Sequence, residues 1–315
     1  MSSAGSISPR VAVLGAGAMG SLYGAAFAEA GVETVLIDVD RELVDHLGRH
    51  GLRLLRDGSE TVVELDVRSD AEGLEPVDLV VFFVKAYATA AAAALIAPAL
   101  RPDTVALSLQ NGWGAGERLL ESFSADRIVV GVSYQSATVR ELGTVERTAG
   151  GATVIGPLQP SGGEAVEVVR AILERAELEP TVSPDVIGDI WEKLVLNTAA
   201  NPTAALARLP AAELTKVPEM RDLVEGVARE TIAVANAIGH RIDAAEALEH
   251  IEATLIAAGE GKGSMLQDVE SGRKTEIEVI TGAVLRAAEG EQLDVPLNRA
   301  IFALIRGYER SRGLA

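Results

Sequence analysis

The stretch Val11-Ala12-Val13-Leu14-Gly15-Ala16-Gly17-Ala18-Met19-Gly20 decides how the first half of this 315-residue chain folds. Its first four residues are a short apolar run of the kind that forms a central parallel strand. The alanine-rich residues 19–30 favour a helix, which Gly31 ends as a C-terminal cap. Thr34–Ile37 follows as a second, β-branched strand. We therefore expect a complete β-α-β unit with a glycine-rich turn between its first strand and its helix.

That turn has the spacing Gly-x-Gly-x-x-Gly and predicts a dinucleotide site. Gly15 allows the tight turn, Gly17 lets the backbone approach a pyrophosphate, and Gly20 lets the helix pack closely on the strand. The phosphates would be bound by free backbone N–H groups at the positive end of the helix. The alternative is a glycine-rich turn that binds nothing. The candidate cofactor-binding residues of the loop are Gly15, Ala16, Gly17, Ala18, Met19 and Gly20.

The end of the second strand bears on which dinucleotide binds. Asp38 lies there, 18 residues after Gly20. A carboxylate at this point accepts hydrogen bonds from the adenosine ribose hydroxyls and repels a 2′-phosphate, which favours NAD over NADP. Arg41, one helical turn further on, can turn toward a phosphate, so NADP is not excluded. Asp38 as an ordinary loop residue also stays open.

Strand and helix patterns continue to alternate through the first half of the chain. This alternation predicts an α/β fold with a mostly parallel, doubly wound sheet. The alanine-dominated stretch Ala86–Leu100 predicts a buried or half-buried helix. The further strands expected are Leu79–Val84, Thr104–Leu109, Ile128–Val132 and Thr153–Ile155.

Beyond Pro180–Pro184 the strand-like runs stop and long helical patterns take over. We expect a Rossmann dinucleotide-binding domain over residues 1–180 and an all-helical substrate-binding domain over residues 181–315. The helical patterns cover Ile187–Ala200, Met220–Ile238, Ala244–Ala258, Ser264–Glu289 and Asn298–Tyr308.

The composition of the chain limits the kinds of molecule that it is expected to bind. The net charge of −18 disfavours binding to nucleic acid or to anionic lipid, while a small anionic substrate in a lysine-containing cleft is still compatible with it. The absence of cysteine excludes disulfides and thiolate zinc sites, and no metal is expected. Residues Met1–Pro9 do not resemble a signal peptide, and no apolar stretch reaches the roughly 20 residues that span a bilayer. We expect a cytoplasmic protein; a homodimer stays open.

The segment Trp191–Pro202 contains the residues best suited to chemistry. Lys193, Asn197 and Asn201 are four residues apart, so a helix places them near one face. An ammonium can polarise the ketone of a 2-oxo acid and donate a proton as hydride arrives, while carboxamides hold carboxylate and hydroxyl groups. Because Pro202 disfavours helical geometry before it, we expect Asn201 at a helix end or kink. A solvated helix face with incidental asparagines is the alternative.

A second polar cluster follows at residues 263–278. On one continuous helix, Ser264, Asp268 and Glu276 share a face, although Gly272 weakens that assumption. Glu276 could orient the lysine ammonium or bond a nicotinamide ribose or a substrate hydroxyl. Surface charge is the alternative for Glu276 and for the neighbouring Glu278.

Together these segments resemble the ketopantoate reductases, also called 2-dehydropantoate 2-reductases. The resemblance runs along the chain from about Val11 to Tyr308. The glycine loop is generic, whereas the lysine and serine segments in this order are specific to the family. The matching motifs are Gly-Ala-Gly-Ala-Met-Gly at 15–20, Val-Lys-Ala-Tyr at 84–87, Gln-Asn-Gly at 110–112, Trp-x-Lys-Leu-x-x-Asn-x-x-x-Asn-Pro at 191–202, Ser-Met-Leu-Gln-Asp-Val-x-x-Gly-Arg-x-Thr-Glu-Ile at 264–277 and Val-Pro-x-Asn at 295–298.

The resemblance implies NAD(P)H-dependent reduction of a branched 2-oxo acid, by default 2-dehydropantoate to pantoate in pantothenate biosynthesis. It implies that Lys193 is the general acid and that Glu276 lies near substrate and cofactor. The substrate-binding positions it implies are Asn111, Asn197, Asn201, Ser264 and Lys85. The cofactor contacts it implies, beyond the glycine loop, are Lys85, Asn111, Glu276 and the backbone of Ala137.

The chain departs from the family pattern at four places. Thr203 follows Asn-Pro where leucine is usual, Gly263 replaces one serine of a common Ser-Ser pair, and Thr281-Gly282 stands where Asn-Gly is frequent. These leave the substrate open. Asp38 stands where most members have a basic residue for a 2′-phosphate. An NAD-dependent dehydrogenase of another small 2-hydroxy acid is therefore the main alternative. The segment from Ser264 argues against a 3-hydroxy acid dehydrogenase, and the intact polar residues argue against a non-enzymatic dinucleotide sensor.

Overall fold

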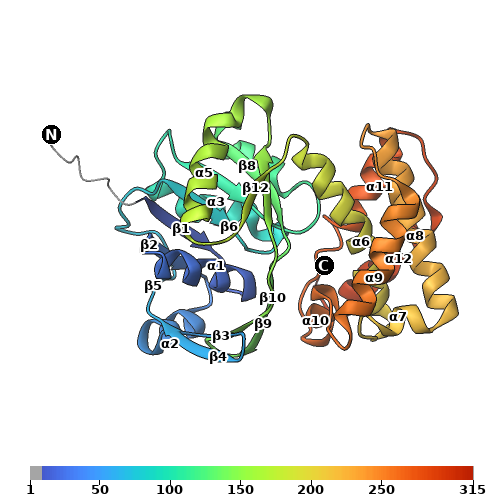
Figure 1. The fold of residues 1–315 in the computed structure, drawn as a ribbon, viewed down its shortest axis with the longest axis horizontal. Coiled ribbons are helices and arrows are strands. Elements are labelled where there is room, and N and C mark those ends of the chain that lie inside the picture. Colours follow the sequence, from blue (N-terminus) through green and yellow to red (C-terminus); the bar gives the residue numbers. More distant parts are fainter. Residues whose placement is uncertain (1–8, 315) are drawn as a thin grey trace. The chain divides into compact units, whose positions relative to one another are not determined.

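The computed structural model describes residues 9–314, which form two units (Figure 1). The first contains the chain up to Gln110 and Ala115–Ile187; the second contains Asn111–Gly114 and the chain from Gly188 onward. The expectation about a signal peptide falls almost wholly on residues 1–8, outside the described part. Among residues 9–314, no helix combines the length and apolarity that crossing a membrane requires.

The first unit is built on an eight-stranded sheet with the order β12-β11-β8-β7-β6-β1-β2-β5. All neighbouring strands are parallel except β8 and β11, which are antiparallel. This confirms the predicted mostly parallel α/β sheet. The strands are β1 (Arg10–Leu14), β2 (Glu33–Ile37), β5 (Asp66–Arg68), β6 (Leu79–Phe82), β7 (Val105–Ser108), β8 (Ile128–Ser133), β11 (Thr153–Pro157) and β12 (Pro180–Val182).

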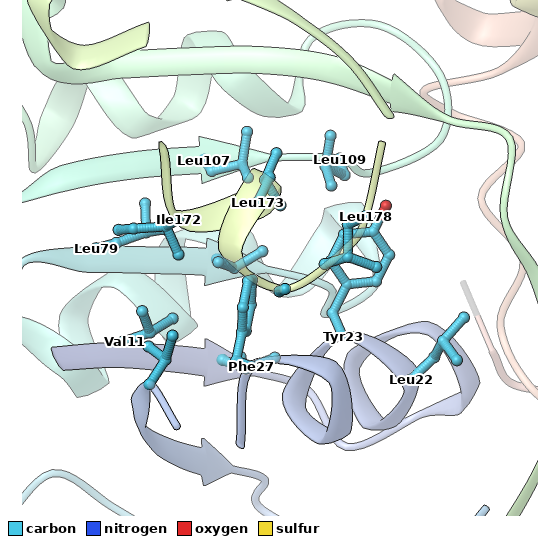
Figure 2. Packing of buried hydrophobic residues seen from close by; sticks show 14 of the residues in the cluster. Val11, Leu22, Tyr23, Phe27, Leu79, Leu107, Leu109, Ile172, Leu173 and Leu178 are labelled. Carbon is cyan, nitrogen blue, oxygen red and sulfur yellow. The ribbon is translucent and has the colours of Figure 1, made fainter. Parts of the chain in front are cut away.

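The central strands are apolar throughout because both faces of the sheet are buried. On one face, Val11 belongs to a core cluster with Phe27 of α1 (Ala18–Glu29) and Ile172 of α5 (Gly163–Arg175), as Figure 2 shows. On the other face, Phe82 meets Phe123 edge-on with 6.1 Å between ring centroids. The two helices and the sheet therefore share one continuous core.

The helices of this unit begin and end as the local sequence predicts. Gly31 follows α1 with φ +68°, and the N–H of Val32 returns to the carbonyl of Phe27. Asp40 accepts hydrogen bonds from the first turn of α2 (Arg41–His50). The alanine-rich stretch forms half-buried α3 (Thr89–Ile96) between short 3-10 turns, and α4 (Ala115–Arg118) follows.

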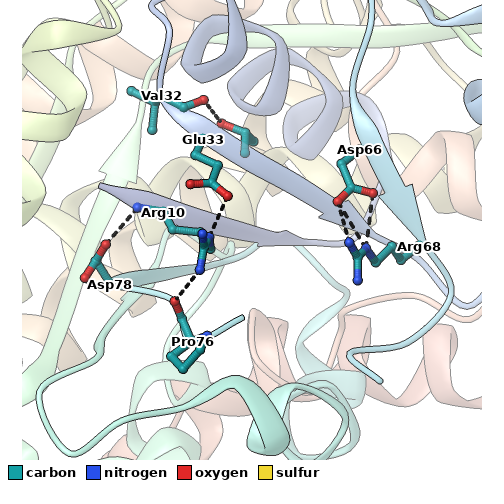
Figure 3. Close-up of polar contacts among 8 residues, drawn as sticks. Arg10, Val32, Glu33, Asp66, Arg68, Pro76 and Asp78 are labelled. Atoms are coloured by element: carbon teal, nitrogen blue, oxygen red, sulfur yellow. Dashed lines mark hydrogen bonds and ion pairs between the residues drawn. The ribbon is translucent and has the colours of Figure 1, made fainter. Parts of the chain in front are cut away.

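Ion pairs join the beginnings of neighbouring strands (Figure 3). The guanidinium of Arg10 donates to Glu33, which lies opposite it in the β1–β2 register, at 2.7 Å. The backbone N–H of Arg10 donates to Asp78 at 2.7 Å, just before β6. Such half-exposed pairs contribute about 0–1 kcal/mol each, so they help to fix the register more than the stability.

A second, four-stranded sheet with the order β4-β3-β10-β9 was not predicted. The hairpin β3–β4 turns at Asp57 and Gly58, which both have positive φ. Its strands carry many charges, as in the pairing of Arg53 with Glu60 at 3.0 Å, and so lack a buried-strand pattern. The strands are β3 (Leu52–Arg56), β4 (Ser59–Val63), β9 (Ser136–Glu141) and β10 (Thr144–Ala149).

The second unit is helical, as predicted. Its core consists of small aliphatic side chains, among them Val195, Ala199, Val227 and Ile301. The helices are α6 (Val186–Ala207), α7 (Glu213–Lys216), α8 (Pro218–Ala237), α9 (Ala244–Ala258), α10 (Ser264–Glu270), α11 (Thr281–Gly290) and α12 (Pro296–Ser311).

Two details of these helices differ from expectation. The expected helix over Ser264–Glu289 is interrupted: α10 ends at Glu270, Gly272 takes φ +65°, and the chain is not helical again until Thr281. Glycine adopts this left-handed conformation without a steric penalty, which ends the helix. Ser264 and Glu276 therefore do not share a helix face.

The second difference concerns Pro202. Helix α6 runs through it to Ala207, so Asn201 lies within the helix and not at its end. Proline removes one backbone hydrogen bond from a helix interior. Here Pro202 and the next three residues are buried, and Ala204 belongs to the helical core, so tertiary packing offsets that loss.

The hydroxyl of Tyr23 tests the core of the first unit. It donates to Ser133 Oγ at 2.8 Å and lies 2.7 Å from Thr153 Oγ1, and burial raises its pKa. Tyr23→Phe leaves both buried hydroxyls without this partner, so the free energy of unfolding should fall by about 1–2 kcal/mol in urea denaturation. Tyr308→Phe, which removes one half-buried hydrogen bond to Val269, should cost less. Equal stability of Tyr23→Phe and wild type would show that the hydrogen bonds of the Tyr23 hydroxyl do not stabilise this core.

Candidate active site

The glycine loop is shaped by two close backbone approaches and one open position. Gly15 has φ +99°, and a Cβ there would lie 2.8 Å from the backbone nitrogen of Val84. A Cβ on Gly20 would lie 1.8 Å from the carbonyl oxygen of Gly15. A Cβ on Gly17 would meet no protein atom within 4 Å. The first and third glycines are thus required by the fold, whereas the second keeps open space in front of the backbone.

The beginning of α1 faces that same loop. Gly17 is the residue before the helix, and no side chain caps its first turn. The N–H groups at a helix start lack helical partners and lie at its positive end. Open space at Gly17 together with an uncapped helix start suits a phosphate group.

Asp38 has a role in holding this loop that the sequence did not reveal. One carboxylate oxygen accepts the N–H of Ala16 at 2.7 Å, and the other accepts the N–H of Asp40 at 2.9 Å. The carboxylate therefore joins the glycine loop to the end of β2. Two carboxylate oxygens offer about four acceptor positions, so Asp38 retains capacity for ribose hydroxyls. Arg41 is exposed in the first turn of α2.

Gln110 has a structural role, although the sequence analysis named it only as part of the Gln-Asn-Gly motif. Its amide donates to the carbonyl of Val84 at 2.7 Å and to Thr89 Oγ1 at 2.9 Å, and it accepts from Ser108. These bonds hold the segment around Lys85, which is half-buried, against the end of β7. An amide directly after a buried strand was the only signal in the sequence.

Ala137 lies elsewhere in the first unit, in β9 of the unpredicted small sheet. It is half-buried and lies opposite Arg147 of β10. Helix α1 packs against β9. The small sheet therefore borders the helix that begins at the glycine loop.

In the second unit, Lys193, Asn197 and Asn201 occupy successive turns of α6. The amide nitrogen of Asn201 donates to the amide oxygen of Asn197 at 3.3 Å, so these two side chains meet on one face. All three residues are half-buried. Burial disfavours the charged form of Lys193 and lowers its pKa from 10.5 to about 8.

Ser264 reaches this neighbourhood from a different helix. It is the first residue of α10, and Gly263 precedes it as the cap position. A Cβ on Gly263 would lie 2.9 Å from Oδ1 of Asn201. The missing side chain of Gly263, noted above as a departure from the family pattern, thus allows the backbone before Ser264 to lie against the Asn201 amide.

Asn111 and Glu276 lie in two non-helical segments that contact each other. Glu276 is 8% exposed and lies in the non-helical stretch between α10 and α11. The N–H of Trp113 donates to the carbonyl of Val279 at 2.8 Å. Gly112 has φ +84°, and a Cβ on it would lie 2.2 Å from the same oxygen. The Asn111–Gly114 loop is therefore fixed against the segment that carries Glu276.

The chain therefore contains a glycine loop with open space at an uncapped helix start, and a lysine with two amides on one helix face. The family model described as ketopantoate reductase PanE/ApbA matches residues 11–160, and the model of its C-terminal part matches residues 185–309. The chain belongs to the ketopantoate reductase family. This confirms the resemblance seen in the motifs and makes the protein an oxidoreductase of the class that interconverts CH–OH and carbonyl groups.

Curated relatives and solved structures are similar to this chain over nearly its full length. The 2-dehydropantoate 2-reductase of Pyrococcus horikoshii is 32% identical, with 96% of this chain and 99% of the relative covered. That of Halobacterium salinarum is 31% identical, with the same coverage. A PanE/ApbA family ketopantoate reductase from Ralstonia eutropha superimposes with a TM-score of 0.86 at 31% identity, covering 96% and 99% of the two chains. D-mandelate dehydrogenase with NADH and anilino(oxo)acetate gives a TM-score of 0.92 at 26% identity, covering 97% and 100%.

The three glycines of the loop make separable predictions. Gly17→Ala adds a methyl group to open space, so stability should be unchanged while dinucleotide affinity falls about tenfold or more, as measured by calorimetric titration. Gly20→Ala forces a Cβ into the carbonyl of Gly15 and should destabilise the fold by about 1–3 kcal/mol. Wild-type affinity in a folded Gly17→Ala variant would rule out phosphate binding at this loop.

Proposed function

We propose that this protein reduces a small branched 2-oxo acid to the 2-hydroxy acid with a nicotinamide dinucleotide, with 2-dehydropantoate as the first candidate substrate. The single observation that carries the proposal is the lysine with a lowered pKa on the helix face that also presents two carboxamides. Family membership and full-length relatives named 2-dehydropantoate 2-reductase support it.

The chemistry of Lys193 fits a proton donor. With a pKa of about 8, roughly 90% of the Lys193 side chain is in the ammonium form at pH 7. In that form it can donate a hydrogen bond to a ketone oxygen and transfer its proton as negative charge develops there. Asn197 and Asn201 would hold the carboxylate and hydroxyl groups, with Ser264 beside them. Glu276 and Asn111 would contribute from the two joined loops, and Glu276 would contact substrate and nicotinamide ribose.

The glycine loop fits the dinucleotide, because a side chain at Gly17 would fill the space that a pyrophosphate needs. The nicotinamide ring, when bound, supplies the hydride for the reduction. We propose NAD as the preferred form, since the Asp38 carboxylate at the end of β2 repels a 2′-phosphate. The residues proposed to hold the dinucleotide are Gly15, Ala16, Gly17, Ala18, Met19, Gly20, Asp38, Lys85, Asn111, Ala137 and Glu276.

A second candidate is an NAD-dependent dehydrogenase of a different small 2-hydroxy acid. The superposition on D-mandelate dehydrogenase favours it, because that enzyme was solved with NADH and an aryl-substituted oxo acid derivative. Gly263 supports it as well, because it replaces one serine of the pair common in the family and so removes one hydroxyl next to the Asn201 amide.

One assay separates these candidates. The absorbance of NADH and of NADPH is followed with 2-dehydropantoate and with a panel of aliphatic and aryl 2-oxo acids. The highest kcat/KM for 2-dehydropantoate with NADH supports the first proposal, and a higher value for an aryl acid supports the second. A preference for NADPH would overturn the role given to Asp38. No turnover of any 2-oxo acid would overturn both candidates.

Replacement of the lysine tests the proton donor. Lys193→Ala should lower kcat by about 10²–10⁴-fold, while the Kd for NADH changes little, because the ammonium acts on charge that develops in the transition state. Lys216→Ala is the matched control, because Lys216 is an exposed lysine of α7 paired with Glu213 at 2.7 Å. Turnover at the wild-type rate in Lys193→Ala would show that another group supplies the proton.

A further inference from the structure

The segment that carries Glu276 does not belong to a regular helix. Residues 271–280 lie between α10 and α11, and within them short-range backbone bonds form a turn in which the carbonyl of Glu276 accepts from Val279 and Ile280. Contacts that hold this segment from outside therefore contribute to the direction of the Glu276 side chain. A glutamate that acts on a substrate must be held within about 0.5 Å of its productive position.

A fully buried carboxylate holds the beginning of this segment. Glu309 of α12 has no exposed surface. One of its oxygens accepts the N–H of Thr275 at 2.9 Å and the hydroxyl of Thr275 at 2.7 Å, and the other accepts from Arg306 at 2.8 Å. Burying a carboxylate is strongly unfavourable unless such charged or polar partners are present. Two of the three donors belong to the residue immediately before Glu276.

The other side of the segment is held by the same helix and by the Asn111–Gly114 loop. Arg306 bridges from Glu309 to Glu278, at 3.3 Å from its carboxylate. The N–H of Trp113 holds the carbonyl of Val279 at 2.8 Å. Glu276 thus lies between fixed points at 275, 278 and 279, and Glu309 anchors the first of them directly.

We infer that Glu309 is a positioning residue for Glu276. By fixing the backbone of Thr275, the fully buried Glu309 sets the direction in which the Glu276 carboxylate is presented. The inference rests on the proposed role of Glu276 in the reaction. Misplacement of a reacting group by about 1 Å can lower turnover by about 10²-fold, so a distant buried residue can have a measurable effect on rate.

Glu309→Gln is the first test. The amide keeps the size of the side chain but replaces one acceptor oxygen with a donor NH₂, so it cannot accept from both Thr275 and Arg306. We expect kcat for 2-oxo acid reduction to fall about tenfold, with the KM for the dinucleotide within about twofold of wild type. Thr275→Val removes the hydroxyl that donates to Glu309 and accepts the N–H of Ile277 at 3.3 Å, so it should also lower kcat, whereas Thr275→Ser keeps the hydroxyl and should retain kcat.

Glu230→Gln is the matched control. Glu230 of α8 also accepts three hydrogen bonds, from the backbone N–H groups of Leu297 and Asn298 and from the Asn298 amide, each at 2.9 Å. It holds the opposite end of α12, far along the helix from Glu309. We expect a loss of thermal stability comparable to that of Glu309→Gln, but unchanged kcat. An equal fall of kcat in both variants would show that Glu309 matters only for stability.

A double-mutant cycle with Glu276 separates positioning from stability. In the Glu276→Gln background, Glu309→Gln should change kcat by less than about twofold, because the carboxylate that it positions is gone. The same fold-loss in both backgrounds would overturn the inference, as would wild-type kcat in Glu309→Gln and Thr275→Val. If Glu276→Gln itself turns over at the wild-type rate, the proposed role of Glu276 fails and the inference with it. If only Glu276→Gln is impaired, the proposed function stands and the inference alone falls.

Discussion

The partial removal of the Lys193 ammonium from water is the physical constraint on which the proposed chemistry depends. Helix α6 is fixed in part by Leu194 and Val195, the two buried residues that directly follow the lysine. The lysine is thereby held where desolvation lowers its pKa to about 8. A proton donor works best when its pKa lies near the working pH, so burial supplies the property that the reaction requires.

Several segments of the candidate site can approach one another closely because they contain glycine. Gly263 lets the start of α10 lie against Asn201, and Gly112 lets the Asn111 loop lie on Val279. In the first unit, Gly20 brings α1 onto the carbonyl of Gly15. At Gly112 and Gly20 the neighbouring atoms are backbone, which is more rigid than a long side chain and so places its neighbours with less freedom.

Much of this arrangement could be predicted from sequence because it depends on local patterns. The apolar run before Gly15 and the four-residue spacing from Lys193 to Asn201 act through strand and helix geometry alone. The small sheet could not be predicted, because β3 pairs in parallel with β10, about 90 residues away, and its strands are charged. The interruption at Gly272 is hard to predict, since a glycine ends a helix only where it adopts the left-handed conformation, and the sequence alone does not show which glycine does so. The contact of Glu309 with Thr275 spans 34 residues and has no sequence signature.

The pH dependence of catalysis tests the central claim most directly. Reduction needs the protonated form of Lys193, and kcat/KM reports the pKa of the free enzyme. With a pKa of about 8, kcat/KM for 2-oxo acid reduction should be level below pH 8 and fall about tenfold per pH unit above it. Oxidation of the 2-hydroxy acid needs the neutral amine and should rise through the same pKa. A reductive profile that stays level to pH 10 would contradict the account.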